Sequence, residues 1–135
     1  MNKQFFISLL FALLTFVILG SLFGNFVFLP EFATWHEAYP DAVRETPDFV
    51  SGFVLGLLQL IAFVVLLPKL QITSGSGAAL FGAVYSVVIW LIVDLQMVSV
   101  TNIVSYEYVL KDALLSAVMG AILGVVVSWS QRRFA

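Results

Sequence analysis

The chain has 135 residues, of which 61% are hydrophobic and only 10% are charged, with a net charge of −2 and a mean hydropathy of +1.07. A soluble domain averages about 25% charged residues, and this chain has too little polar surface to cover an apolar core, so we expect lipid to be its solvent. The absence of cysteine excludes disulfides and thiolate metal sites, and without a basic patch nucleic acid is a poor partner.

The first long apolar segment covers residues 5–29 and follows a single cation, Lys3. A signal peptide is disfavoured because the apolar run is too long and no Ala-x-Ala cleavage site follows it. We therefore expect a first membrane-spanning helix that carries Gly20 and Gly24 in its second half and stops at Pro30.

Residues 31–48 are the only extended polar stretch, and we call them the cap. Aromatic residues recur in it at spacings of three and four, which predicts a short amphipathic helix lying at the membrane interface. The single histidine, His36, lies between Trp35 and Glu37 and could bind a metal together with Glu37 and Asp41. No further His or Cys residues at ligand spacing accompany it, so we predict no metal site.

Three more apolar segments follow, at about residues 49–67, 78–100 and 108–130. Each is long enough to cross a hydrocarbon core of roughly 30 Å as a helix. Gln59 lies near the middle of the second span, and the Ser-Gly-Ser-Gly run at residues 74–77 predicts a flexible connection. The sequence thus predicts an all-α membrane protein: one integral domain, built as a four-helix transmembrane bundle with an interfacial segment between the first two helices.

Charge predicts the orientation of this bundle. With four spans, Lys3, Lys69, Arg132 and Arg133 lie on one side, whereas all eight acidic residues lie on the other, with Arg44 and Lys111. Cytoplasmic connections are enriched in Lys and Arg, so we expect a multi-pass protein of the inner (plasma) membrane with both termini in the cytoplasm.

Small residues recur every four positions and predict close helix contacts, because small side chains let helices approach each other in lipid. In the last two spans these stripes also carry Asp94 and Asp112. Seams within the bundle are favoured over a homodimer face. The glycines predicted to pack are Gly20, Gly24, Gly52, Gly56, Gly82, Gly120 and Gly124.

Asp94 and Asp112 are the leading candidates for a ligand-binding site, because ionisable residues within spans usually face a bundle interior or a wet cavity. If they meet, one carboxyl keeps its proton or a cation lies between them. Trp90, one turn before Asp94, offers an aromatic face to a cation, and Gln59 offers an amide. The structural alternative is that both carboxylates lie near water and pair with Lys111 or Arg44, or accept hydrogen bonds, while Gln59 only joins helices.

The last two spans also carry a family resemblance. Gly82, Tyr85, Asp94, Thr101-Asn102 and Asp112 resemble the C-terminal half of small four-span bacterial inner-membrane protein families of unknown function. The spacing departs from that pattern, since Thr101 follows Asp94 by seven positions and the first span has no Asp. The resemblance implies the four-span fold and no particular reaction.

Two functions remain open. One is a membrane protein that binds, and by extension transports, a small cationic or amphipathic ligand at an outward-facing acidic pocket. The other is an accessory or scaffold subunit without a ligand of its own, whose glycine stripes contact a second copy or a larger membrane protein. An enzyme is least supported, since there is no nucleophile elbow, P-loop or dinucleotide motif, and we predict no cofactor.

Overall fold

The computed structural model describes residues 3–135, which form helices joined by short connections and contain no strand. Four helical stretches are long and apolar enough to cross a membrane, which confirms the predicted all-α fold. The elements are α1 (Lys3–Phe23), the π-helical turn η1 (Gly24–Phe28), α2 (Leu29–Ala38), α3 (Phe49–Lys69), α4 (Gly75–Val100) and α5 (Tyr106–Arg133).

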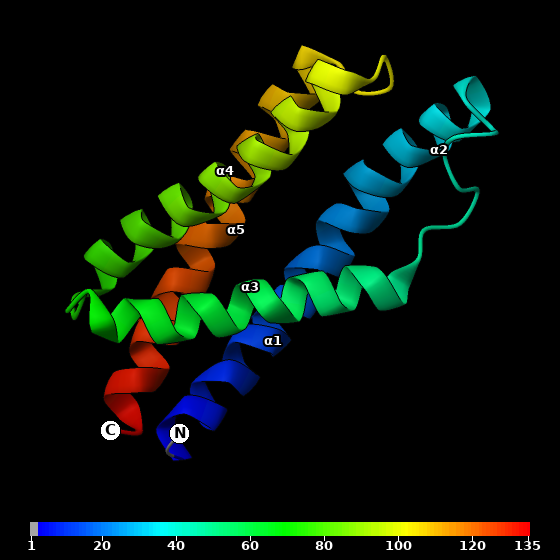
Figure 1. Cartoon of the computed structure of the whole chain (residues 1–135). Helices are drawn as coiled ribbons and strands as arrows, with labels where there is room; N and C mark the ends of the chain where they lie inside the picture. Colours follow the sequence, from blue (N-terminus) through cyan, green and yellow to red (C-terminus); the bar gives the residue numbers. More distant parts are fainter. Residues whose placement is uncertain (1–2) are drawn as a thin grey trace.

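α1, η1 and α2 form one continuous limb of 36 residues, which we call the α1–α2 limb (Figure 1). The sequence predicts that the helix stops at Pro30, and this prediction is wrong, because the chain remains helical to Ala38. A proline inside a regular α-helix clashes with the carbonyl group four residues earlier. Here the preceding turn is π-helical, and the Leu29 N–H bonds to the Gly24 carbonyl five residues back, so the chain accommodates Pro30 and remains helical. Only residues 39–48 of the cap lie outside helices.

Side-chain caps fix the beginnings of the other helices. The Asp48 carboxylate accepts hydrogen bonds from the first-turn amides of α3, and Ser105 does the same for α5. Ser74 accepts a hydrogen bond of 3.0 Å from the Gly77 N–H, so residues 75–77 form the first turn of α4 rather than the expected flexible connection.

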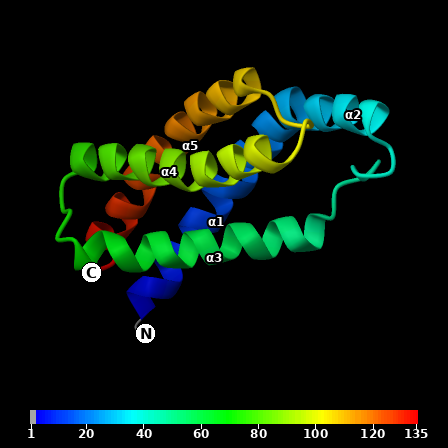
Figure 2. The same cartoon turned by 45° about the horizontal axis from the view of Figure 1, so that its top comes forward.

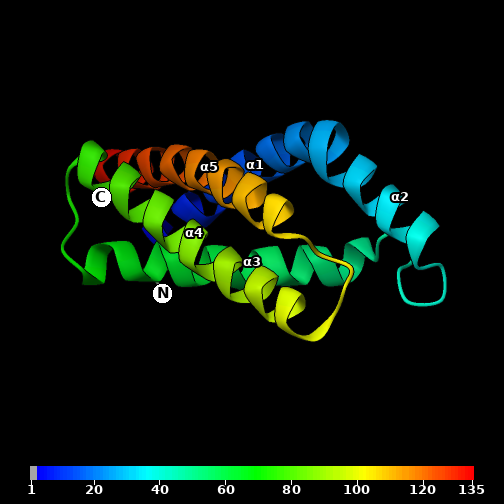
Figure 3. The same ribbon diagram turned by 90° about the horizontal axis from the view of Figure 1, so that it is seen from above.

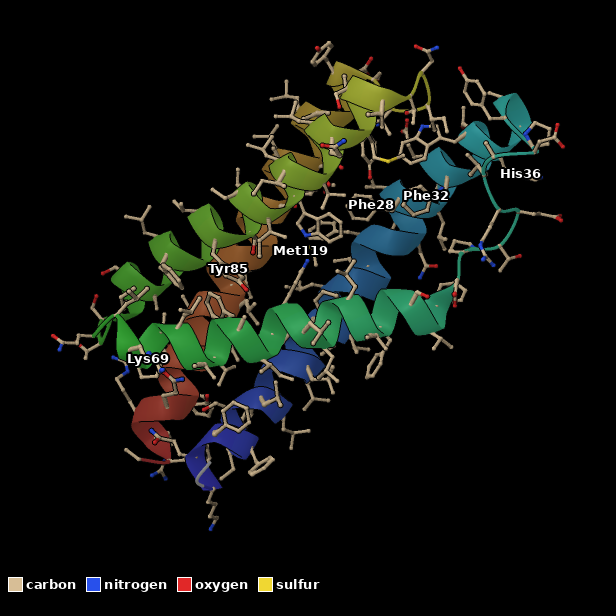
Figure 4. The ribbon with its side chains drawn as sticks, in the orientation of Figure 1. Phe28, Phe32, His36, Lys69, Tyr85 and Met119 are labelled. Carbon is tan, nitrogen blue, oxygen red and sulfur yellow. The ribbon has the colours of Figure 1, made fainter. Side chains whose placement is uncertain are left out.

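The helices diverge from one end of the molecule to the other. Both chain termini lie at one end, which we call the termini end, whereas α2 and the 101–105 loop lie at the opposite cap end (Figures 1 and 2). Figure 4 shows Lys69 and His36 at these two ends. In Figure 1, α3 runs obliquely to the limb, α4 and α5 instead of parallel to them, and in the view from above α4 passes across α3 (Figure 3).

The main core lies toward the termini end. A hydroxyl–hydroxyl hydrogen bond of 3.0 Å joins Ser130 of α5 to Ser8 of α1, and the Gln131 amide donates to the Val64 carbonyl of α3 at 3.0 Å. Toward the cap end, by contrast, residues 49–55 of α3 are exposed on every side of the helix. The buried apolar core consists of Ala12, Leu60, Phe63, Val64, Leu67, Ala78, Leu123 and Val127.

Candidate functional site

Asp94 of α4 and Asp112 of α5 meet across the interface between these two helices. Their side chains are 5% and 4% exposed, and the two carboxyl groups lie within hydrogen-bonding reach of each other. The Ser116 hydroxyl, one turn further along α5, donates to Asp112 Oδ1 at 3.2 Å. The structure therefore brings together the two carboxyl groups that the sequence singles out.

The small-residue stripes explain how the carboxyl groups come so close. A Cβ atom added to Gly82 would collide with the Gly120 carbonyl group, and one added to Gly124 would collide with the Ala78 carbonyl group. The backbones of α4 and α5 thus touch along an antiparallel seam. Asp94 and Asp112 continue the same four-residue spacing toward the cap end, so the seam carries them to opposing positions.

Among residues 3–135, no cationic side chain forms an ion pair with Asp94 or Asp112. Lys111, the residue next to Asp112, instead forms an ion pair of 3.1 Å with Glu31 of α2. Asp94 Oδ2 is buried and receives no hydrogen bond from any residue between 3 and 135. Two ionised carboxylates side by side repel each other, so this geometry requires a proton or a cation between them.

An aromatic row joins the limb to α5 beside the pair. The Trp35 and Tyr108 rings meet edge to face with their centroids 4.7 Å apart, and Tyr108 lies one turn before Asp112 on the same face of α5. Phe32 packs against Trp35 at 5.1 Å and Phe28 against Phe32 at 6.4 Å. Figure 4 shows Phe28 and Phe32 next to each other on the limb. Tyr108 belongs to a second buried apolar cluster, against which Phe28 and Trp35 pack.

A cavity of about 50 Å³ lies among α1, α3, α4 and α5. Trp90 and Gln59, both predicted site residues, line it together with Ser116, whereas Asp94 and Asp112 do not. Ser116 therefore touches both the cavity and the carboxyl pair. The Tyr85 hydroxyl donates to the Gln59 carbonyl oxygen at 3.0 Å, which fixes one wall. Tyr85 and Met119, another lining residue, lie in the middle of the molecule in Figure 4.

The cap residues divide into two groups. Trp35 packs beside the carboxyl pair, whereas His36 Nδ1 donates to the Val43 carbonyl at 2.7 Å and Glu37 is exposed. Within residues 3–135, no three His, Asp or Glu side chains gather as a metal-binding cluster. His36 and Glu37 therefore shape the cap rather than the acidic pair.

Asp48 lies outside the spans, at the beginning of α3, where its carboxylate accepts several hydrogen bonds. The Ser51 hydroxyl donates to Asp48 Oδ2 at 2.7 Å, and the amides of Val50 and Ser51 donate to Oδ1 at 3.1 and 3.3 Å. These bonds, with the Ser51 hydroxyl first, lower the pKa of Asp48 below its ordinary value of 3.8. The Asp48 carboxylate therefore caps α3 and is not part of the candidate site.

The other predicted packing glycines differ in their surroundings. A Cβ atom added to Gly56 would meet the Phe16 ring of α1 at 2.7 Å, so Gly56 lets α3 approach α1. A Cβ atom added to Gly20, Gly24 or Gly52 would meet nothing within 4 Å. Within this one chain these three glycines form no seam, because α3 and the limb have diverged where they lie.

Sequence reasoning did not select Tyr108 or Glu31 as site residues, and it named Tyr85 only for the family resemblance. The position of Tyr108, four residues before Asp112, signals its place on the same helical face. No comparable signal exists for Glu31, whose ion pair with Lys111 depends on the limb continuing beyond Pro30.

These helices define a class of protein, a small multi-pass membrane protein with four apolar spans that associates with a lipid bilayer. A search of family models, curated proteins and solved structures finds no match to this chain.

Proposed function

We propose that the protein binds a small cation between Asp94 and Asp112, in a non-catalytic role. The observation that carries the proposal is the uncompensated carboxyl pair, buried on the α4–α5 seam with Asp94 Oδ2 left without a donor. Burying an acidic pair without a counter-charge is costly, and spans retain such groups where ions or protons bind.

The size of the neighbouring cavity limits the occupant. A volume of about 50 Å³ holds only a few water molecules, whereas a drug-sized ligand needs roughly 300–1,000 Å³. A proton shared by the two carboxyl groups needs no additional space, and a monovalent cation is small enough for the cavity that Ser116 links to Asp112. An amphipathic ligand would fit only after α3 or the limb has moved.

The direction of access follows from charge. The acidic pair lies at the cap end with all the other acidic residues, whereas Arg132 and Arg133 lie at the termini end. The excess of Lys and Arg near the termini supports a cytoplasmic location for both termini, in an inner (plasma) membrane. The site would then take up its cation from the outside, and transport would require passage past Trp90 toward the cytoplasm.

Thermal unfolding in detergent at constant ionic strength tests this proposal. Sodium, potassium or tetramethylammonium should raise the unfolding temperature of the wild type, because a ligand stabilises the state that binds it. Asp94→Asn and Asp112→Asn should abolish the shift, whereas Glu107→Gln, an exposed neutralisation on α5, should retain it.

The same measurement distinguishes a proton from a larger cation as the occupant. If the occupant is a proton, no cation shifts the unfolding temperature, but its pH dependence changes in Asp94→Asn. Identical cation and pH responses in the wild type and Asp94→Asn would refute the proposal.

An accessory or scaffold role is the second candidate. It is supported by residues 49–55 of α3, exposed on every side, and by the open space at Gly20, Gly24 and Gly52. These surfaces suit a second copy or a larger membrane partner. Gly52→Leu should then abolish copurification or self-association in the membrane while Asp94→Asn leaves it intact. Unchanged association in Gly52→Leu and Gly20→Leu would argue against this role.

A further inference from the structure

A separate groove of about 520 Å³ runs between the limb and α5 on the outside of the molecule. Its walls are apolar, and Phe26 and Leu114 are more than half exposed. A charged pair, Glu31 and Lys111, lines it as well. It has no residue in common with the cavity below Asp94 and Asp112.

The irregular part of the limb builds one wall of this groove. Phe26 and Val27 belong to the π-helical turn, and Pro30 and Glu31 follow directly in α2. A π-helical turn inserts an extra residue and displaces side chains from the regular helical face. Phe26 and Val27 thereby form an apolar wall opposite Leu114 and Leu115 of α5.

The charged pair lies at the level of lipid headgroups. Lys111 is 21 positions before Arg132 on α5, which corresponds to about 32 Å along the helix. A hydrocarbon core of roughly 30 Å therefore places these two cations near opposite membrane surfaces. Glu31 Oε2 lies 3.1 Å from Lys111 Nζ, and both side chains retain exposure, at 25% and 41%.

We propose that this groove binds one phospholipid with a zwitterionic ethanolamine headgroup. The lipid phosphate accepts from Lys111, the primary ammonium donates to Glu31, and an acyl chain lies between Phe26 and Leu114. The groove volume falls within the roughly 300–1,000 Å³ typical of ligand sites. A bulk lipid needs no such site, but a groove with apolar walls and one charge of each sign at the headgroup level matches the chemistry of this molecule.

Local charge favours this headgroup over an anionic one. Glu107 lies one turn before Lys111 on α5, so Glu31, Glu107 and Lys111 together carry an excess negative charge. This excess negative charge repels an anionic glycerol headgroup, whereas it attracts an ammonium group. A choline headgroup has no N–H with which to donate to Glu31, so ethanolamine should also bind better than choline.

Native mass spectrometry of the delipidated protein tests the assignment. Phosphatidylethanolamine, phosphatidylcholine and phosphatidylglycerol with identical acyl chains are added in turn, and the fraction of protein carrying one lipid is measured. We expect phosphatidylethanolamine to be retained best, and Glu31→Gln or Lys111→Gln to weaken it about tenfold, the effect of losing one charge-assisted hydrogen bond. Lys69→Gln, a neutralisation at the termini end, should have no effect.

A second variant separates lipid binding from the link between α2 and α5. Leu114→Trp fills the apolar part of the groove without changing the ion pair, and it should displace the lipid while the unfolding temperature is maintained. Equal retention of the three lipids would overturn the proposal, because it indicates surrounding bilayer lipid only. Retention unchanged in both Glu31→Gln and Leu114→Trp would overturn it too, since the ion pair would then only join the two helices.

Discussion

The contact between α4 and α5 at Gly120 makes the sharpest prediction about stability. In Gly120→Ala the new Cβ atom would lie 2.7 Å from the Gly82 carbonyl carbon and 2.5 Å from Ser86 Oγ, and it would also collide with the Gly82 carbonyl oxygen. Unstrained contacts need about 1 Å more, and backbone atoms cannot rotate away as a side chain does. The helices must therefore separate by on the order of 1 Å, which forfeits a quarter to a half of each dispersion contact along the seam.

We expect Gly120→Ala to lower the free energy of unfolding by about 1–3 kcal/mol, the usual cost of overpacking. Gly52→Ala is the matched control, because nothing lies within 4 Å of its new Cβ atom. Replacing that helical glycine should be neutral or stabilising by up to about 1 kcal/mol. Unfolding is followed by circular dichroism in detergent. Equal stability of the two variants would refute the backbone contact between α4 and α5.

Three further predictions concern the acidic pair, the α3 cap and the aromatic row. Asp94→Asn should keep wild-type stability to within about 1 kcal/mol because its amide donates to Asp112, whereas Asp94→Ala leaves Asp112 buried without that partner and should cost about 1–3 kcal/mol in the same unfolding assay. Because the pKa of Asp48 is lowered below 3.8, its cap stabilises α3 above that pH and is lost as the pH falls through the lowered value. Hydrogen exchange of the first-turn amides should therefore be faster in Asp48→Ala at neutral pH, and equal in variant and wild type in strong acid. Trp35→Ala should destabilise the protein by about 1–3 kcal/mol by removing the ring contact with Tyr108, and equal unfolding temperatures would contradict this contact.

The sequence predicts the α4–α5 pair well because the relevant information is local. Only residues 101–105 join the two helices, so they must be antiparallel neighbours. Each helix also presents one stripe of small residues that predicts a close contact, but the sequence leaves open whether Asp94 and Asp112 meet on it. The four spans follow from length and hydropathy alone.

The course of the limb could not be predicted in this way. Proline normally ends a helix, and nothing local announces that a π-helical turn will accommodate Pro30. The contact between Trp35 and Tyr108 depends on this continuation, so the sequence does not predict it either. Glycine spacing was also ambiguous: Gly20 and Gly24 repeat the spacing of Gly120 and Gly124, yet only the second pair meets a backbone, because the motif permits close approach without specifying a partner.

The two halves of the molecule differ in how easily they can rearrange. Along the α4–α5 seam, backbone contacts at Gly82 and Gly124 leave no space into which either helix could shift, so the distance between Asp94 and Asp112 is fixed by the helices themselves. The limb contacts the cap end of α5 through packing of Trp35 on Tyr108 and through one partly exposed ion pair, and exposed ion pairs contribute little to stability. Residues 49–55 of α3 are all exposed and therefore have little packing to lose. Access to the acidic pair should therefore open by movement of the limb or of α3, while α4 and α5 remain together as the rigid half that positions the carboxyl groups.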